Sequence, residues 1–394
     1  MVKSVWLEGA DITRLETAKD NAAFVKALFD DEKSQRFVES FLMHHYKIDN
    51  LTGGVDPVMA KDRFHIMTLM QEESRLFLWD IFKNDKEKSI GHLTVNVCGF
   101  SRGAAAARHF VARRTSEFFP QYPSLSGSLG IPPAKITINF VGLFDTVSSY
   151  GGEKHKNVVT QTYNNVKNKS FDDDVDELHL AIGANAKQVV QLAAADEYRK
   201  NFASTNILSS VRAKVGLEVK LPGVHSDVGG SYEEKKEERR WITSFEKKRL
   251  IEEGWYTTEQ LPIGPNDGWW SEGVRVLTNA YQFIPLAIMV DLAQQSAMQF
   301  HPFEGKYAAY QVPGPLQGLA AAMHGYVLGR PAPRSMKPYE PAQYVLPDQY
   351  KWVRNQYLHR SAIQGSTPKA NLTMGGRYVN RLPSRQIIPD STAH

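Results

Sequence analysis

The stretch VNVCGFSRGAAAARHF, residues 95–110, constrains the fold of this chain more than any other feature. β-Branched residues lead into Gly99-Phe100-Ser101-Arg102-Gly103, and an Ala-rich run with one apolar face follows. This order predicts a buried strand, a sharp turn and a helix. In that setting the pattern G-x-S-x-G is typical of a nucleophile elbow, the strained turn that presents a reactive serine.

The elbow explains why glycines flank the serine. A bulky side chain at Gly99 or Gly103 would clash with the strand or the helix, so Ser101 is the candidate nucleophile. The helix that begins here points its positive end at the reaction centre, and the backbone N–H of Arg102 is the expected first oxyanion donor. The alternative is an ordinary strand–turn–helix with an incidental serine.

A serine needs a base and an acid, which in α/β-hydrolases follow it in the order acid, then histidine, at strand ends. Asp145 ends the apolar run ITINFVGLFD, and His225 lies just beyond EVKLPG. We therefore expect Asp145 to orient His225, and His225 to take the serine proton. A helix cap for Asp145 and a turn role for His225 are the alternatives. Asp227 competes for the acid role, but it is only two residues from His225.

The order of apolar runs predicts an α/β fold with a mostly parallel sheet flanked by helices. We expect strands at 92–99, 135–145 and 216–223, and a helix at 103–119. The segment 176–202 reads as mostly helical, which would make Asp196 and Glu197 structural helix residues.

The remaining segments suggest three regions: a catalytic core at 1–232, a helical insertion, cap or lid at 233–330, and a loop-rich basic segment at 331–394 packed on the core. Further expectations are a strand at 3–9, helices up to 46 and at 57–83, a charged helix at 233–253 and a mostly buried helix at 277–300.

Composition excludes several classes of function. With 47 Lys and Arg against 43 Asp and Glu, the net charge of +4 is too small to indicate nucleic-acid binding. The first residues lack the apolar run of a signal peptide, and no stretch approaches the ~18 apolar residues of a transmembrane helix. FDDDVDE (171–177) lacks the glycine of a calcium loop, so we interpret it as a solvated segment, with a cation site as the alternative. We expect no metal ion and no cofactor at the candidate site.

Three blocks of the sequence resemble one known family. GFSRGAAAAR, FVGLFDTVSSYG and LPGVHSDVGGSY are similar to the signature blocks of the uncharacterised α/β-hydrolase domain family. That family includes the phospholipase effectors of bacterial type VI secretion systems. AAADEYRKNF also resembles a family block, and the resemblance covers about residues 90–232.

The resemblance implies Ser101 as nucleophile, Asp145 as acid and His225 as base. It also implies a phospholipase that cleaves acyl esters of membrane phospholipids. Made without a signal peptide, it would be delivered as an antibacterial toxin into the periplasm of target cells by a secretion spike protein, and a dedicated immunity protein would neutralise it. A soluble-ester hydrolase and a non-catalytic toxin scaffold are the alternatives.

One family feature is missing from the sequence. Members usually open with a strand ending in Asp-Gly-Thr, placed to help build the oxyanion hole, and no Asp-Gly-Thr occurs here. We therefore expect the first family strand to be absent or otherwise supplied, which leaves the second oxyanion donor unassigned.

Overall fold

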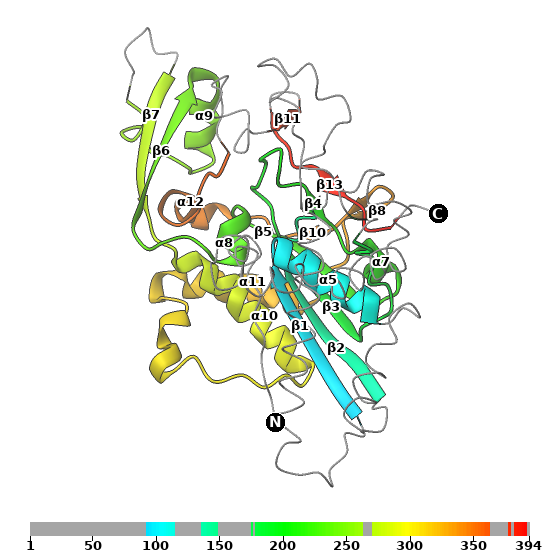
Figure 1. The fold of residues 1–394 in the computed structure, drawn as a ribbon. Helices are drawn as coiled ribbons and strands as arrows, with labels where there is room; N and C mark the ends of the chain where they lie inside the picture. The colour runs from blue at the N-terminus through cyan, green and yellow to red at the C-terminus, as the bar shows by residue number, and fades with distance from the viewer. Residues whose placement is uncertain are drawn as a thin grey trace, which may run out of the picture.

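A sheet of five parallel strands forms the centre of the computed structural model, in the order β1-β2-β3-β5-β10 (Figure 1). Its strands are β1 (His92–Phe100), β2 (Lys135–Phe144), β3 (Gln188–Ala194), β5 (Gly216–Leu221) and β10 (Ala342–Gln343). The structure describes residues 92–114, 135–148, 175, 178–262, 270–362, 377–379 and 382–391. This sheet confirms the α/β fold and the mostly parallel pairing that the sequence predicts.

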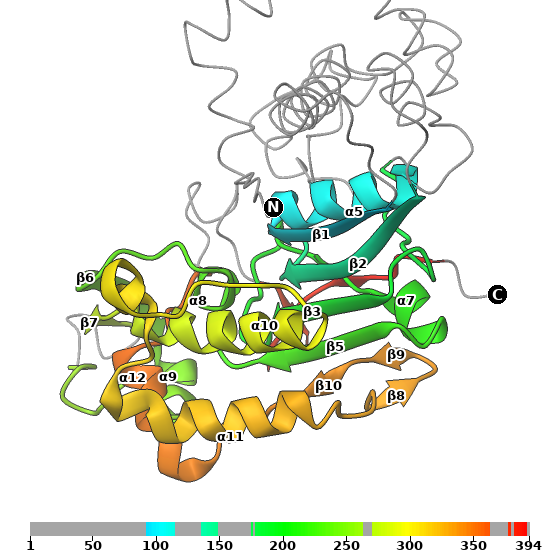
Figure 2. The same ribbon diagram turned by 90° about the horizontal axis from the view of Figure 1, so that it is seen from below.

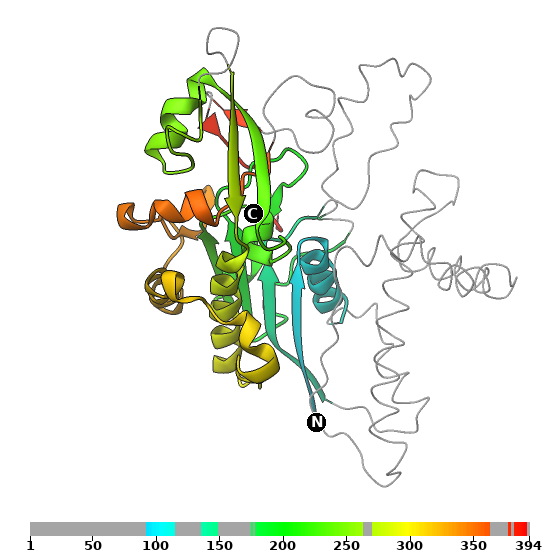
Figure 3. The ribbon, with the colours of Figure 1, turned by 90° about the vertical axis from the view of Figure 1, so that its left-hand side faces the viewer.

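Helices cover both faces of the sheet, giving three layers (Figures 2 and 3). One face packs against α5 (Arg102–Arg114) and α7 (Leu208–Arg212), and the other against α10 (Phe283–Gln295) and α11 (Gln317–Leu328). Alternate side chains of β2 point to opposite faces of the sheet and pack against different helices. Val141 and Leu143 join the cluster under α5, whereas Phe140 and Phe144 join the larger cluster under α10 and α11. Burial on both faces is typical of parallel sheets and explains the continuous apolar runs.

Further elements lie at the two ends of the sheet (Figure 2). β6 (Lys236–Thr243) and β7 (Trp270–Leu277) pair antiparallel and protrude beside α8 (His225–Gly229), and α9 (Ser244–Glu252), which follows β6, packs on them (Figure 1). The last part of the chain adds a short strand, β13, parallel to β4. The remaining strands and α-helices are β4 (Ser204–Thr205), β8 (Ser335–Met336), β9 (Tyr339–Glu340), α12 (Trp352–Gln356), β11 (Tyr378–Val379), β12 (Leu382–Pro383) and β13 (Ile387–Ile388).

Several predicted elements are confirmed. The strands expected at 92–99, 135–145 and 216–223 are β1, β2 and β5, and the Ala-rich helix is α5. The buried helix expected within 277–300 is α10. The predicted strand at 3–9, the predicted helices before residue 84 and the question of a first family strand lie outside the described residues.

The helix expected at 176–202 is wrong. Its centre is β3, a strand between β2 and β5, with turns and loops on both sides. From Val189 to Ala194 every residue of β3 is buried, because helices cover both faces of the sheet there. Tertiary burial therefore overrides the helical propensity of the alanines.

The charged helix expected at 233–253 is also wrong in its first half, which is β6. Glu238 points inward because Arg275 of β7 forms a buried ion pair with it. Only the second half, α9, is helical. A charged residue that is neutralised across a strand pair can face the interior, so the charge pattern did not mark a solvent-facing helix.

Within the described part of the chain, no helix combines the length and apolar character needed to span a bilayer.

Candidate active site

Ser101 stands on a strained turn between β1 and α5. Its backbone φ is 59°, in the left-handed region that a non-glycine residue seldom adopts. The turn is held in place because the Ser101 N–H donates to the Phe144 carbonyl at 3.0 Å, and its own carbonyl accepts from Ala104 at 3.1 Å. Strain of this kind persists only where surrounding contacts enforce it, and it is common at functional sites.

Gly99 leaves the space that this turn needs. A Cβ built at Gly99 would lie 2.4 Å from the carbonyl oxygen of Gly103 and 2.7 Å from the Cα of Ala104. Both contacts are with backbone, which cannot move aside as a side chain can. The first glycine of G-x-S-x-G is therefore required by the close approach of strand and helix.

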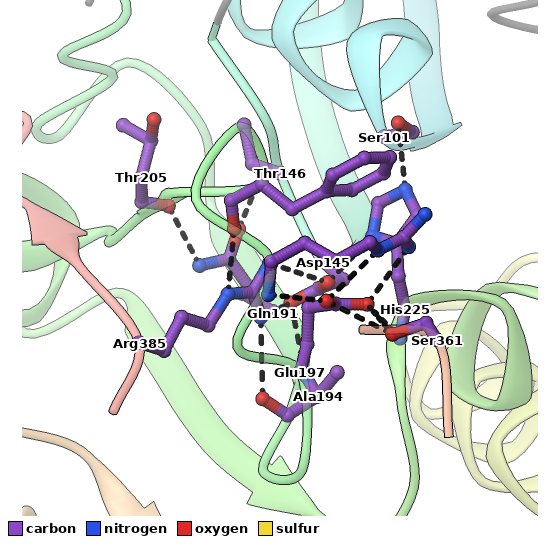
Figure 4. A network of polar contacts seen from close by, with 12 residues as sticks. Ser101, Asp145, Thr146, Gln191, Ala194, Glu197, Thr205, His225, Ser361 and Arg385 are labelled. Carbon is purple, nitrogen blue, oxygen red and sulfur yellow. Dashed lines mark hydrogen bonds and ion pairs between the residues drawn. The ribbon is translucent and has the colours of Figure 1, made fainter. Parts of the chain in front are cut away.

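Asp145 and His225 reach Ser101 from the carboxyl ends of β2 and β5, two strands of the same sheet with β3 between them (Figure 4). Asp145 directly follows β2, and His225 begins α8 a few residues after β5. His225 Nε2 is 2.8 Å from Ser101 Oγ, and His225 Nδ1 is 2.6 Å from Asp145 Oδ2. The three predicted residues are thus brought together in one hydrogen-bonded chain. Arg102 begins α5, so its backbone N–H lies at the positive end of that helix.

Neighbouring charges and burial determine which of Ser101, His225 and Asp145 carry protons. Burial by itself would raise the pKa of Asp145, but the charge of Arg385 and the hydrogen bond with His225 outweigh it and hold that pKa well below its usual range. Burial lowers the pKa of His225, although the hydrogen bond and charge of Asp145 oppose the change. An ionised Asp145 accepts the Nδ1 proton, which leaves Nε2 as the acceptor for the Ser101 hydroxyl.

Two aromatic rings enclose the imidazole of His225. The Phe100 ring centroid is 4.5 Å from that of His225, and the Phe202 ring meets it edge-on at 5.0 Å. A Cβ at Gly229 would lie 2.0 Å from Phe100 Cε2, so the glycine of the HSDVG block makes room for this ring. These rings contribute to the burial that lowers the pKa of His225.

Two further charged residues were not predicted as part of the site. The Arg385 guanidinium binds both carboxylate oxygens of Asp145. Glu197, expected in a helix, instead lies in the loop after β3, where its Oε2 accepts the backbone N–H of His225 at 3.3 Å. Arg199 and Ser361 hold Glu197 in turn. No motif marks Arg385, whereas Glu197 lies in the block AAADEYRKNF.

The other candidate acids have different partners. Asp227 accepts His359 Nδ1 at 2.7 Å and the Val224 N–H at 2.9 Å, and so joins α8 to the segment after α12. Asp196 accepts the Gly223 N–H at 2.7 Å. Most of the acidic stretch 171–177 lies outside the described residues, among which no group of three His, Cys, Asp or Glu side chains could hold a metal ion.

Comparisons with known proteins point to the same family as the sequence blocks. Residues 130–253 match the family model described as the type VI secretion system phospholipase effector Tle1-like catalytic domain. No curated protein matches the chain.

Two solved structures are similar at low sequence identity. One is the Tle1 effector bound to the VgrG spike of the type VI secretion system, with 22% identity, a TM-score of 0.48, and coverage of 76% of this chain and 68% of that chain. The other is an uncharacterized protein from Pseudomonas aeruginosa, with 21% identity, a TM-score of 0.37, and coverage of 79% of this chain and 39% of that chain.

The matched segment includes Asp145 and His225 and begins after the elbow. The match of residues 130–253 to this family model confirms the family resemblance of the sequence blocks, of which FVGLFDTVSSYG, AAADEYRKNF and LPGVHSDVGGSY lie inside the matched segment.

Proposed function

We propose that this protein is a serine hydrolase of the phospholipase A type, with Ser101 as nucleophile, His225 as base and Asp145 as acid. The observation that carries the proposal is the continuous hydrogen-bonded chain from Ser101 Oγ through His225 to Asp145, with distances of 2.8 and 2.6 Å. The match of residues 130–253 to a phospholipase effector domain supports the choice of a lipid ester.

The geometry suits acyl transfer through a covalent intermediate. Ser101 Oγ attacks the ester carbonyl while His225 Nε2 takes its proton, and the Arg102 N–H stabilises the oxyanion. When the intermediate collapses, the protonated His225 gives its proton to the departing lysophospholipid oxygen. Water, deprotonated by His225, then attacks the acyl-enzyme, and the fatty acid leaves as Ser101 regains its proton.

The family resemblance also suggests how the protein is delivered and what its partners are. The Tle1 effector is bound to a VgrG spike in the solved complex. We propose that this chain is also carried by a spike protein into target cells, where it acts as an antibacterial toxin on periplasmic membrane phospholipids. An immunity protein in the producing cell would neutralise it.

Two alternatives lead to different measurements. An esterase for soluble substrates would use the same three residues, and a non-catalytic toxin scaffold would use none of them. The hydrogen bond between His225 Nε2 and Ser101 Oγ favours catalysis over a scaffold, because it places a base where it can take the serine proton.

The test is hydrolysis of a short-chain phosphatidylcholine below and above its critical micelle concentration. We expect the rate of fatty-acid release to rise steeply once micelles form, because a phospholipase acts on aggregated lipid. A rate that saturates smoothly while the lipid is monomeric would indicate a soluble-ester hydrolase. No release at any concentration, matching the Ser101→Ala background, would contradict both hydrolase functions.

A further inference from the structure

Arg385 joins the site from the last part of the chain, 240 residues after Asp145. It lies between β12 and β13, and its side chain is only 8% exposed. Its Nη1 donates to Asp145 Oδ1 at 2.6 Å and its Nη2 donates to Asp145 Oδ2 at 2.8 Å (Figure 4). This two-pronged geometry fixes the plane of the carboxylate as well as its position.

The rest of the guanidinium is also bound. Arg385 Nε donates to the Phe202 carbonyl at 2.8 Å, and Nη1 donates to the Ala194 carbonyl at 3.2 Å. Phe202 is the residue whose ring packs edge-on against His225. The Arg385 side chain therefore holds both Asp145 and the backbone of Phe202, whose ring packs against His225.

The chain around Arg385 is anchored on both sheet and helix. β13 pairs with β4, where Ile387 lies opposite Ser204. Asp390, further along, forms a buried ion pair with Arg108 of α5 at 2.9 Å and accepts the Ser209 N–H. These contacts fix the backbone on the C-terminal side of Arg385, so its guanidinium is held in place beside Asp145.

Two carboxylates and two guanidinium groups lie around His225, so their charges offset one another. Asp145 contacts its Nδ1, and Glu197 accepts its backbone N–H. Arg385 faces Asp145, and Arg199 binds Glu197 while lying 3.3 Å above the Phe202 ring. From β1 the packed group is the uncharged Phe100 ring. Removal of Arg385 would leave two carboxylates and one guanidinium around the imidazole.

We propose that Arg385 is a positioning residue of the reaction, one that orients the Asp145 carboxylate toward His225 and keeps His225 uncharged until Ser101 gives up its proton. The inference rests on the proposed function of Ser101, Asp145 and His225. It makes the segment 382–391 part of the active site.

The direction of the pH effect follows from the charges. Burial, and then the charge of Arg385, lower the pKa of His225, against the opposing effect of Asp145. Loss of that positive charge should raise the pKa of His225. Since only neutral His225 can accept the serine proton, the acid limb of kcat/KM should move to higher pH by the same amount.

The experiment compares Arg385→Gln, Arg385→Lys and Arg334→Gln with the wild-type chain. Arg334 is exposed and donates to Gln343, so its change to Gln removes the same charge from a side chain that does not bind Asp145. The pKa of His225 is read by NMR of ¹³C-labelled histidine in chains that also carry Ser101→Ala, and kcat/KM is measured against pH in chains that retain Ser101.

We expect Arg385→Gln to raise both the pKa of His225 and the acid limb, and Arg334→Gln to change neither. Arg385→Lys should keep the acid limb near the wild-type value but lower kcat about tenfold or more, because an ammonium cannot bind both carboxylate oxygens in one plane. If Arg385→Gln unfolds, the Arg385→Lys result decides, and wild-type kcat in that variant would overturn the proposal.

An unchanged His225 pKa in Arg385→Gln would also overturn the proposal, whether or not the chain hydrolyses lipid. A wild-type chain without hydrolase activity would instead refute the proposed function, and the NMR titration would still decide the role of Arg385.

Discussion

Ser101→Ala should lower kcat for phospholipid hydrolysis by about 10⁴-fold or more. The variant keeps the elbow but removes the oxygen that lies 2.8 Å from His225 Nε2, so no acyl-enzyme can form. Fatty-acid release from phospholipid micelles, followed by titration or mass spectrometry, measures the loss. KM should change little, because the hydroxyl contributes little to binding of the ground-state ester.

Ser226→Ala is the matched control for this change. Ser226 is next to His225 in α8, but the proposed mechanism gives its hydroxyl no role. We expect wild-type rates from Ser226→Ala and an unchanged melting temperature for Ser101→Ala. Residual activity of Ser101→Ala within tenfold of wild type would rule out Ser101 as the nucleophile.

Asp145→Asn should lower kcat by about 10⁴-fold near neutral pH. Asp145 accepts four hydrogen bonds, from Ala194, His225 and twice from Arg385. An amide presents one oxygen and one NH₂ group, so it cannot accept from both the imidazole and the guanidinium fork. The imidazole would then lose the partner that keeps its proton on Nδ1.

The same variant should also be less stable, because it leaves the guanidinium of Arg385 buried opposite a neutral group. Thermal unfolding separates the two effects, with kcat measured well below the unfolding transition. A folded Asp145→Asn chain with more than about a tenth of wild-type kcat would contradict the role of Asp145 as the acid.

The elements nearest the site could be predicted because their chemistry is local. Gly99, Ser101 and Gly103 lie within five residues, and the elbow requires a strand before them and a helix after them. Asp145 and His225 each follow an apolar β-rich run, and parallel strands bring their carboxyl ends to one edge. Strand-end placement was therefore enough to predict that these side chains would meet.

β3 and β6 could not be predicted because their surroundings decide their conformation. QLAAADE is rich in alanine, and only the position of its first four residues between β2 and β5 makes them part of a buried strand. KEERRWIT carries five charges, and its inward Glu238 is stable only because Arg275 on β7 lies opposite. In both cases the deciding partner is a segment distant in the sequence.

Arg385 had no signal in the sequence for a related reason. It belongs to no motif, and its partner Asp145 is 240 residues away. The fold brings them together through the pairing of β13 with β4, which involves only two residues of each strand. A pairing that short has no recognisable pattern, so the link emerges only from the tertiary structure.

The central claim is that Ser101 is a nucleophile activated by His225, and covalent trapping tests it most directly. The chain is incubated with a fluorophosphonate that carries a long alkyl chain, and the labelled peptide is identified by mass spectrometry beside the Ser101→Ala and His225→Ala variants. The proposed mechanism predicts a single adduct on Ser101, absent in Ser101→Ala and formed far more slowly in His225→Ala. An unlabelled wild-type chain, or an adduct on a different serine, would contradict it.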